Sequence, residues 1–111
     1  MFEEILHRRG TTLVRRMRLA PGETTAWHRD PFHRLSVVLS GDLLAIEFRD
    51  SSPRIVAGLT PGQVDWSEPS DRIHRAVNAG QQTYEEVTVF SLSDPGDVPQ
   101  PSYDWAFSFF H

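Results

Sequence analysis

The sequence has 111 residues with a formal net charge of −4, and 39% of its side chains are apolar. This size fits one domain around one hydrophobic core and excludes an enzyme built from two domains. Cysteine is absent, which excludes disulfides, thiolate nucleophiles and iron–sulfur clusters. Lysine is also absent, so Schiff-base chemistry is excluded. A mildly acidic chain of this kind predicts no nucleic-acid partner.

The amino-terminal residues and the apolar runs bear on location. No run approaches the roughly 20 consecutive apolar residues that a membrane-spanning helix requires. The first residues, MFEEILHRRG, place acidic side chains before a short apolar pair, which is unlike a secretory signal. We therefore expect a cytoplasmic protein without a membrane partner.

Short runs rich in Val, Ile, Leu, Phe and Thr alternate with turn residues along the whole chain. Their spacing of roughly ten residues is typical of antiparallel sheets that close into a sandwich or barrel. No window of helical periodicity is long enough to compete. The sequence predicts an all-β single domain with strands near residues 12–19, 24–29, 35–39, 43–49, 54–57, 63–67, 73–77 and 83–92.

The run 43–49 shows the alternation of a half-buried strand. Leu44, Ile46 and Phe48 share one face, while the residues between them, including Glu47, share the other. The runs 73–77 and 84–90 alternate less regularly. Such mixed alternation is typical of a small barrel in which one face packs and the other lines a cavity.

The carboxyl-terminal segment 95–111 differs from the rest in its prolines and its dense aromatic residues. An exposed aromatic segment would favour aggregation. We expect it to pack on the barrel or against a second subunit, and we favour the second subunit. The predicted assembly is a homodimer.

His28, Asp30 and His74 are the candidate metal ligands. His28 and Asp30 are two positions apart, so on an extended strand they project from the same face. His74 falls on a much later strand, and pairing of the two strands would bring both imidazoles and the carboxylate to one point. This is the composition of the 2-His-1-carboxylate triad, which holds a divalent metal, typically Fe(II), and leaves positions open for substrate and O₂.

Glycine, proline and asparagine residues frame these histidines at defined spacings. The frame consists of Gly22, Gly41, Gly62, Pro69 and Asn78 around His28 and His74. It resembles the two motifs of the cupin family, G-x5-H-x-H-x(3,4)-E-x6-G and G-x5-P-x-G-x2-H-x3-N. The resemblance covers residues 22–78 and implies a small antiparallel β-barrel of the jelly-roll type, also called a double-stranded β-helix. It also implies a divalent transition metal such as Fe, Mn, Ni or Zn in the mouth of the barrel. We expect Asn78 to fix a turn with Gly80 through a left-handed backbone conformation.

The sequence departs from the cupin motifs at two ligand positions and in the second turn. Asp30 stands where the family has its second histidine and can still bind a metal. Arg34 stands where the family has its glutamate and cannot. Asp71 replaces a glycine of the second motif, and one extra residue separates Gly62 from Pro69.

Arg34 poses an electrostatic problem for a metal. A guanidinium about 6 Å from a divalent cation is repelled by roughly 5 kcal/mol at an effective dielectric constant near 20. We therefore expect Arg34 to turn away, to pair with a carboxylate such as Glu47, or to hold an anionic substrate, unless the protein binds no metal at all.

The other candidate positions have open alternatives. His33 follows Pro31, which can bend the segment so that His33 joins His28 and His74 in a three-histidine site like that of some cupin dioxygenases; the alternative is a solvated loop histidine. Trp27 and Trp66 either line the cavity and hold a planar substrate or belong to the core. Of the adjacent residues 85 and 86, one glutamate faces inward, as a general base or as the partner of Arg34.

Two classes of function remain. The first is a metal-dependent enzyme acting on a small organic substrate, for which the resemblance implies dioxygenase, isomerase or lyase chemistry. The second is a metal-free cupin that binds a small ligand as a sensor, with Arg34 holding an anion. A variant of the second class is a metal-free isomerase in which His28 and an inward carboxylate move protons.

Overall fold

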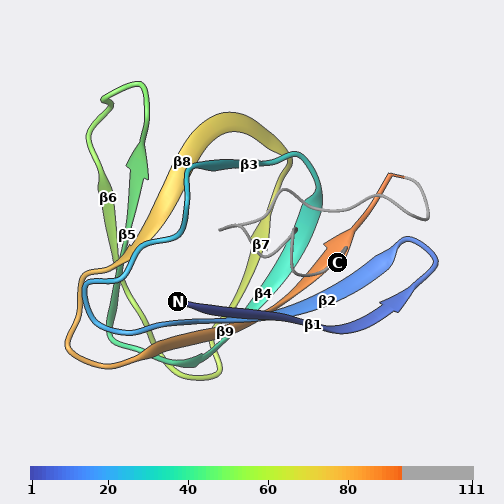
Figure 1. The fold of residues 1–111 in the computed structure, drawn as a ribbon, viewed down its shortest axis with the longest axis horizontal. Helices are drawn as coiled ribbons and strands as arrows, with labels where there is room; N and C mark the ends of the chain where they lie inside the picture. Colours follow the sequence, from blue (N-terminus) through green and yellow to red (C-terminus); the bar gives the residue numbers. More distant parts are fainter. Residues whose placement is uncertain (94–111) are drawn as a thin grey trace.

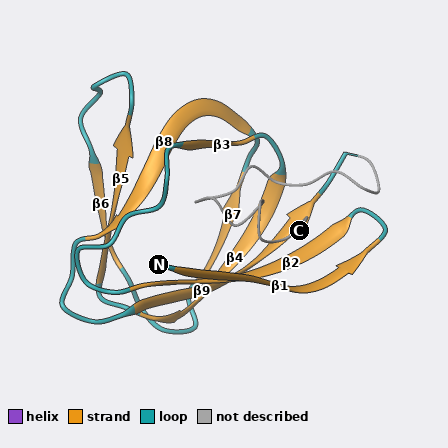
Figure 2. Ribbon diagram, in the orientation of Figure 1, coloured by secondary structure: helices purple, strands orange, loops and turns teal. Residues whose placement is uncertain are grey.

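The structure is a computed structural model that describes residues 1–93. Within this range it consists of strands and loops without a helix (Figure 2). In chain order the strands are β1 (Phe2–Arg9), β2 (Thr12–Leu19), β3 (His28–Asp30), β4 (His33–Ser40), β5 (Leu43–Phe48), β6 (Ile55–Gly58), β7 (Val64–Ser67), β8 (Ser70–Asn78) and β9 (Tyr84–Ser91). The all-β prediction is confirmed. The segment 95–111, which we expect at a barrel or subunit contact, lies outside the described residues.

The strands form two antiparallel sheets, which Figure 1 shows facing each other. The larger sheet has the order β1-β2-β9-β4-β7 and the smaller one the order β3-β8-β5-β6. Side chains from the inner faces of both sheets line a cavity of about 450 Å³. With this strand order, consecutive strands are often in different sheets. Residues far apart in sequence therefore meet across the cavity.

The core lies at two places along the inner face of the larger sheet. Strands β2 and β9 alternate between buried and more exposed residues, as the period of two requires. Leu13 and Phe90 are directly opposite each other and fully buried. A second cluster forms around Met17, Leu19 and Tyr84. Met17 and Tyr84 of the second cluster also line the cavity.

Strand β1 is absent from the sequence prediction. Its pairing with β2 shifts register between Ile5 and His7, and the intervening Leu6 is exposed. Such a bulge interrupts the period of two. Because the prediction relied on that alternation, it could not find this strand.

Gly22 and Asn78 connect the loop between β2 and β3 to the end of β8. The predicted strand 24–29 is shorter in the structure, where Thr24 forms an isolated bridge with Val77 before β3 begins. Gly22 has a φ of 82°, and its N–H donates to the carbonyl oxygen of Asn78 at 2.9 Å. The left-handed conformation favours glycine at this position.

Asn78 fixes its surroundings through its side chain. The expectation of a left-handed backbone is wrong, because Ser51 is the only non-glycine residue of the described chain with positive φ. Instead, the buried amide group donates to the carbonyl oxygens of Leu19 and Gln82, and its oxygen accepts the N–H of Gly80. Asn78 thus joins the end of β2 to the β8–β9 turn.

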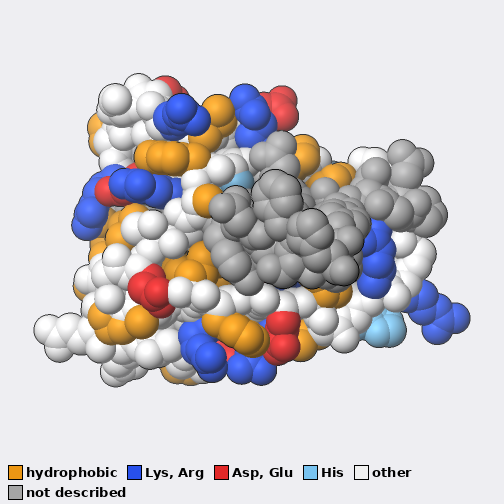
Figure 3. Space-filling model, in the orientation of Figure 1, with side chains coloured by type: hydrophobic (Ala, Val, Ile, Leu, Met, Phe, Trp, Pro, Cys, Tyr) orange, Lys and Arg blue, Asp and Glu red, His pale blue; other side chains and the backbone are white. Residues whose placement is uncertain are grey.

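The exterior carries charges of both signs. On the face drawn in Figure 3, basic and acidic side chains lie interspersed. No helix among residues 1–93 is long and apolar enough to cross a membrane.

Candidate metal centre

His28 and His74 are directly opposite each other in the β3–β8 pair. The next paired residues are Asp30 and Ser70, so β8 contains more residues than β3 over the same interval. This irregularity lets the short β3 present both His28 and Asp30 toward His74. The two imidazole rings are 4.6 Å apart.

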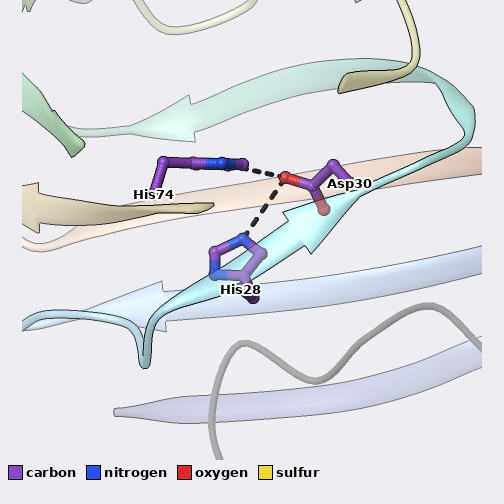
Figure 4. A group of neighbouring side chains, drawn as sticks. All are labelled: His28, Asp30 and His74. Carbon is purple, nitrogen blue, oxygen red and sulfur yellow. Dashed lines mark ion pairs between the residues drawn. The ribbon is translucent and has the colours of Figure 1, made fainter. Parts of the chain in front are cut away.

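The carboxylate of Asp30 completes the group (Figure 4). Its Oδ2 atom is 2.8 Å from Nε2 of His74 and 3.3 Å from Nε2 of His28. The Asp30 side chain is 1% exposed, and both histidines are buried. The structure therefore brings together the three residues that the H-x-D pattern and the distant histidine indicate.

The hydrogen bonds of the opposite ring nitrogens define the tautomers. Nδ1 of His28 is 2.8 Å from the carbonyl oxygen of Ala26, and Nδ1 of His74 is 2.9 Å from that of Arg72. A carbonyl oxygen can only accept, so each Nδ1 carries a proton. In a neutral ring the lone pair of Nε2 then points at Asp30, and three acceptors converge. A metal ion between them, or a proton on an Nε2 atom, resolves this conflict.

The geometry fits a metal ion. Oδ2 of Asp30 is buried without a hydrogen bond of acceptable geometry, although both rings approach it. One ligand atom from each residue can be chosen so that all lie within 4.8 Å of one another. Two ligands bound about 2.1 Å from one ion lie about 3.0–3.4 Å apart at octahedral or tetrahedral angles. The two nitrogen–oxygen distances are close to that range, and ordered Nδ1 donors are usual for histidine ligands.

The contacts within this group shift the pKa of two members. Burial alone would raise the pKa of Asp30, but the contacts with His28 and His74 and the charge of Arg34 outweigh it, so that pKa lies far below its usual value. For His74, burial alone would lower the pKa, but the contact with Asp30 and the carbonyl of Arg72 raise it. The lowered pKa of Asp30 favours the ionised carboxylate that a metal requires, whereas the raised pKa of His74 favours a protonated ring, whose Nε2 proton a metal must displace.

Arg34 also lies at this site. Its Nη1 is 3.0 Å from the same Oδ2 of Asp30, and its side chain is 22% exposed. Asp30 ends β3 in the smaller sheet and Arg34 lies in β4 of the larger sheet, so the ion pair joins the two sheets. Glu47, which we named as a partner for Arg34, pairs instead with Arg75 and Arg54.

The cavity beside this group has one apolar and one polar wall. Leu44, Ile46 and Phe48 line it from β5, as the alternation of that strand predicts. The larger sheet carries a row of polar residues in directly opposed positions on β2, β9, β4 and β7: Arg15, Thr88, Ser36 and Asp65. Arg15, Ser36 and Asp65 line the cavity, whereas Thr88 is fully buried. The hydroxyl groups of Ser36 and Thr88 are 3.0 Å apart. A ligand in the cavity would contact apolar atoms on one side and hydrogen-bonding groups on the other.

A second buried charge cluster lies on the polar wall. The hydroxyl of Tyr84 donates to Glu86 at 2.7 Å, and Arg15 lies 3.5 Å from Glu86 and 3.0 Å from Glu3. Burial and the Glu86 charge raise the pKa of Tyr84 far above its usual value, so the phenol stays neutral. Of the adjacent residues Glu85 and Glu86, Glu86 thus faces inward, but its cationic partner is Arg15 rather than Arg34. Sequence reasoning missed Arg15, although its place among Leu13, Met17 and Leu19 indicates an inward charge.

The structure places the other candidates away from the cavity. His33 is 49% exposed, with Nδ1 3.0 Å from Glu68, and its ring stacks on Trp66 at 5.5 Å. Trp66 is 57% exposed, whereas Trp27 lies under the guanidinium of Arg75. Neither these residues nor Glu47 belong to the cavity lining among the described residues. The structure places His33 at the surface, as its solvated alternative describes. Substrate contacts of Trp27, Trp66 and Glu47 stay predictions, and such contacts would lie outside this cavity.

Comparisons with known proteins place the fold. No protein-family model and no curated protein matches the sequence. Among solved structures, a cupin domain from Bordetella pertussis Tohama I has a TM-score of 0.70 and 20% identity, over 80% of this chain and 90% of that one. A protein with a double-stranded β-helix domain from Klebsiella pneumoniae has a TM-score of 0.65 and 22% identity, over 86% of this chain and 79% of that one.

A third similar structure is an oxalate oxidase in complex with the substrate analogue glycolate, with a TM-score of 0.58 and 22% identity. The match covers 81% of this chain but only 46% of the oxidase chain. These likenesses show the fold. The protein has a small cupin fold, which is a double-stranded β-helix. Its cavity contains a candidate His-Asp-His metal centre.

Proposed function

We propose that the protein is a metal-dependent cupin in which His28, Asp30 and His74 hold a divalent transition metal beside a small organic substrate. The observation that carries this proposal is the convergence of two imidazole Nε2 atoms on one buried carboxylate oxygen. Two neutral imidazoles and one carboxylate suit Fe(II), Mn(II), Ni(II) or Zn(II) and leave other coordination positions open. A bound metal of this kind supplies a Lewis acid or a redox centre for oxygenase, isomerase or lyase chemistry.

The chain's own residues then bind and orient the substrate. The apolar side chains of β5 pack against its hydrocarbon part, while Ser36 offers a hydroxyl group on the opposite wall. Arg34 offers a cation for an anionic group. The oxalate oxidase with bound glycolate supports a small anionic substrate, because that similar fold accommodates a small carboxylate.

The second candidate is a metal-free cupin that binds a small anion. The Arg34–Asp30 ion pair favours the absence of a metal in this candidate, because the guanidinium already balances the carboxylate. A cytoplasmic homodimer remains part of the proposal in either case.

Metal analysis distinguishes the two. The protein should be purified without an affinity tag, and its content of Fe, Mn, Ni and Zn measured before and after chelation and reconstitution with each ion. About one ion per chain supports the metal-dependent cupin. A correctly folded protein that takes up none of the four metals supports the metal-free one.

A further inference from the structure

Arg34 and a metal would compete for the same atom. The guanidinium lies 3.0 Å from Oδ2 of Asp30, which is also the atom nearest to both imidazole Nε2 atoms. With neutral rings, the carboxylate and the guanidinium balance each other. A divalent ion that binds Asp30 therefore removes the counter-charge of Arg34 and adds positive charge beside it.

The other carboxylates among the described residues of the cavity lining already have hydrogen-bond or ion-pair partners. The remaining acidic residues of the cavity lining are Asp65, which accepts from Gln63, and Glu86, which contacts Tyr84 and Arg15. A partly buried guanidinium without a counter-ion is strongly disfavoured. We therefore expect the negative charge at Arg34 to come from outside the described chain once a metal is bound.

The surroundings of Arg34 suit a carboxylate ligand. Its Nε is buried and makes no hydrogen bond, while the side chain lines the cavity. Ser67 lies directly opposite Arg34 in the β4–β7 pair, and Ser36 follows on the same face of β4; both also line the cavity. A guanidinium presents parallel N–H donors that match the two oxygens of a carboxylate, and neighbouring hydroxyl groups add donors.

We propose that Arg34 couples metal binding to the binding of a small carboxylate: it neutralises Asp30 in the metal-free protein and binds the carboxylate once the metal occupies Asp30. This inference rests on the proposed metal-dependent function and specifies its substrate class. Coupling between two sites is reciprocal, so the carboxylate must tighten metal binding by the same factor by which the metal tightens carboxylate binding.

Metal affinity in the presence of acetate tests the coupling. Isothermal titration calorimetry of the chelated, untagged protein uses whichever of Fe(II), Mn(II), Ni(II) and Zn(II) binds most tightly in the reconstitution. Titrations are run at constant ionic strength with chloride alone, with acetate, and with acetamide, the neutral analogue. We expect acetate to lower the metal dissociation constant by about tenfold. Acetamide should have no effect.

Two variants locate the effect. Arg34→Gln should bind the metal more tightly than wild type in chloride and should show no response to acetate. Arg54→Gln is the matched control, because Arg54 is a half-exposed arginine that lies 3.6 Å from Glu47 on the surface. Arg54→Gln should respond to acetate as wild type does. Any complex of the metal with acetate in solution affects all variants equally, so the comparison between variants also corrects for it.

The outcomes separate this inference from the proposed function. Metal binding that is equal in acetate and acetamide overturns the coupling and leaves the metal site standing. An acetate response that persists in Arg34→Gln also overturns the role of Arg34. If wild type binds none of the metals under any condition, the proposed function and the coupling both fail. If Arg34→Gln does not fold, the comparison of acetate with acetamide on wild type still tests the coupling between metal and carboxylate binding.

Discussion

The imidazole rings of His28 and His74 are oriented by the same kind of hydrogen bond, although the two residues lie on different strands. In each case Nδ1 donates to the carbonyl oxygen two residues earlier in the chain, Ala26 for His28 and Arg72 for His74. The backbone thus orients both Nε2 atoms toward Asp30 before any metal arrives. Such preorganisation reduces the conformational entropy lost on metal binding.

Removing either ring should strongly weaken metal binding. We expect His28→Ala and His74→Ala each to weaken metal affinity by more than about a hundredfold, because loss of a direct ligand should exceed the effect of changing its hydrogen-bond partner. Elemental analysis after dialysis against a metal buffer measures the change. His33→Ala is the control, since this exposed histidine faces Glu68, and it should retain wild-type metal content. Equal metal in His74→Ala and wild type would rule out the site.

The buried cluster around Arg15 should matter for stability. Its side chain is 3% exposed and contacts Glu3, which is 1% exposed, as well as Glu86. Arg15→Met leaves both carboxylates buried near an apolar side chain, and loss of a buried partner typically costs about 3–5 kcal/mol of unfolding free energy. Urea denaturation measures the change as a lower transition midpoint.

A surface arginine provides the comparison for Arg15. Arg54 is 51% exposed and lies 3.6 Å from Glu47. Arg54→Met should change the free energy of unfolding by less than about 1 kcal/mol, as is typical of exposed ion pairs. Similar losses in the two variants would mean that the Arg15 cluster is as well solvated as the surface pair.

The local part of the site could be predicted from the sequence. His28 and Asp30 share a face because side chains two positions apart do so in any extended strand. The alternation of residues 43–49 likewise indicated which side chains of β5 face inward, and Leu44, Ile46 and Phe48 do line the cavity. The all-β fold followed from the spacing of turn residues.

The partner of each charged residue could not be predicted, because it depends on register between distant strands. Arg34 pairs with Asp30 since the chain crosses from β3 in one sheet to β4 in the other between them. Arg15 meets Glu86 because β2 and β9 are neighbours, with Met17 opposite Glu86. Neither relationship leaves a mark in local composition, and a one-residue change of register would reverse which side chains face inward.

The carboxylate of Asp42 gives the protein a testable acid sensitivity. Backbone N–H groups of Gln81, and next of Gln82, donate to it and lower its pKa below the ordinary value of 3.8, against the effect of burial. A group with a lower pKa in the folded state contributes stability above its unfolded pKa and loses that contribution as pH falls through the folded pKa.

Comparison with Asp42→Asn isolates this contribution, because asparagine keeps one acceptor oxygen but does not titrate. We expect wild type to be the more stable of the two at pH 7, and the difference in unfolding free energy to shrink as pH falls below about 3.8. Urea unfolding at a series of pH values measures both proteins, and the other carboxylates cancel in the difference. A gap that stays constant down to pH 2 would show that the Asp42 charge contributes nothing.

The position of the Asp42 carboxylate requires a glycine at position 80. A Cβ added to Gly80 would lie 1.7 Å from Oδ1 of Asp42, which is far inside van der Waals contact. Gly80→Ala should therefore displace the Asp42 side chain, break its hydrogen bonds to the β8–β9 turn and lower the free energy of unfolding. Gly58→Ala is the matched control, because its added Cβ meets no atom within 4 Å.

A double-mutant cycle with Asp42→Ala tests whether this contact is the cause. If the clash with the carboxylate carries the loss, Gly80→Ala should cost little once Asp42 is already alanine, and the two changes should be strongly non-additive. Thermal or urea unfolding of the four proteins provides the cycle. Full additivity would contradict the proposed contact and would place the effect of Gly80→Ala in the backbone of the turn, where Asn78 holds the Gly80 N–H at 3.0 Å.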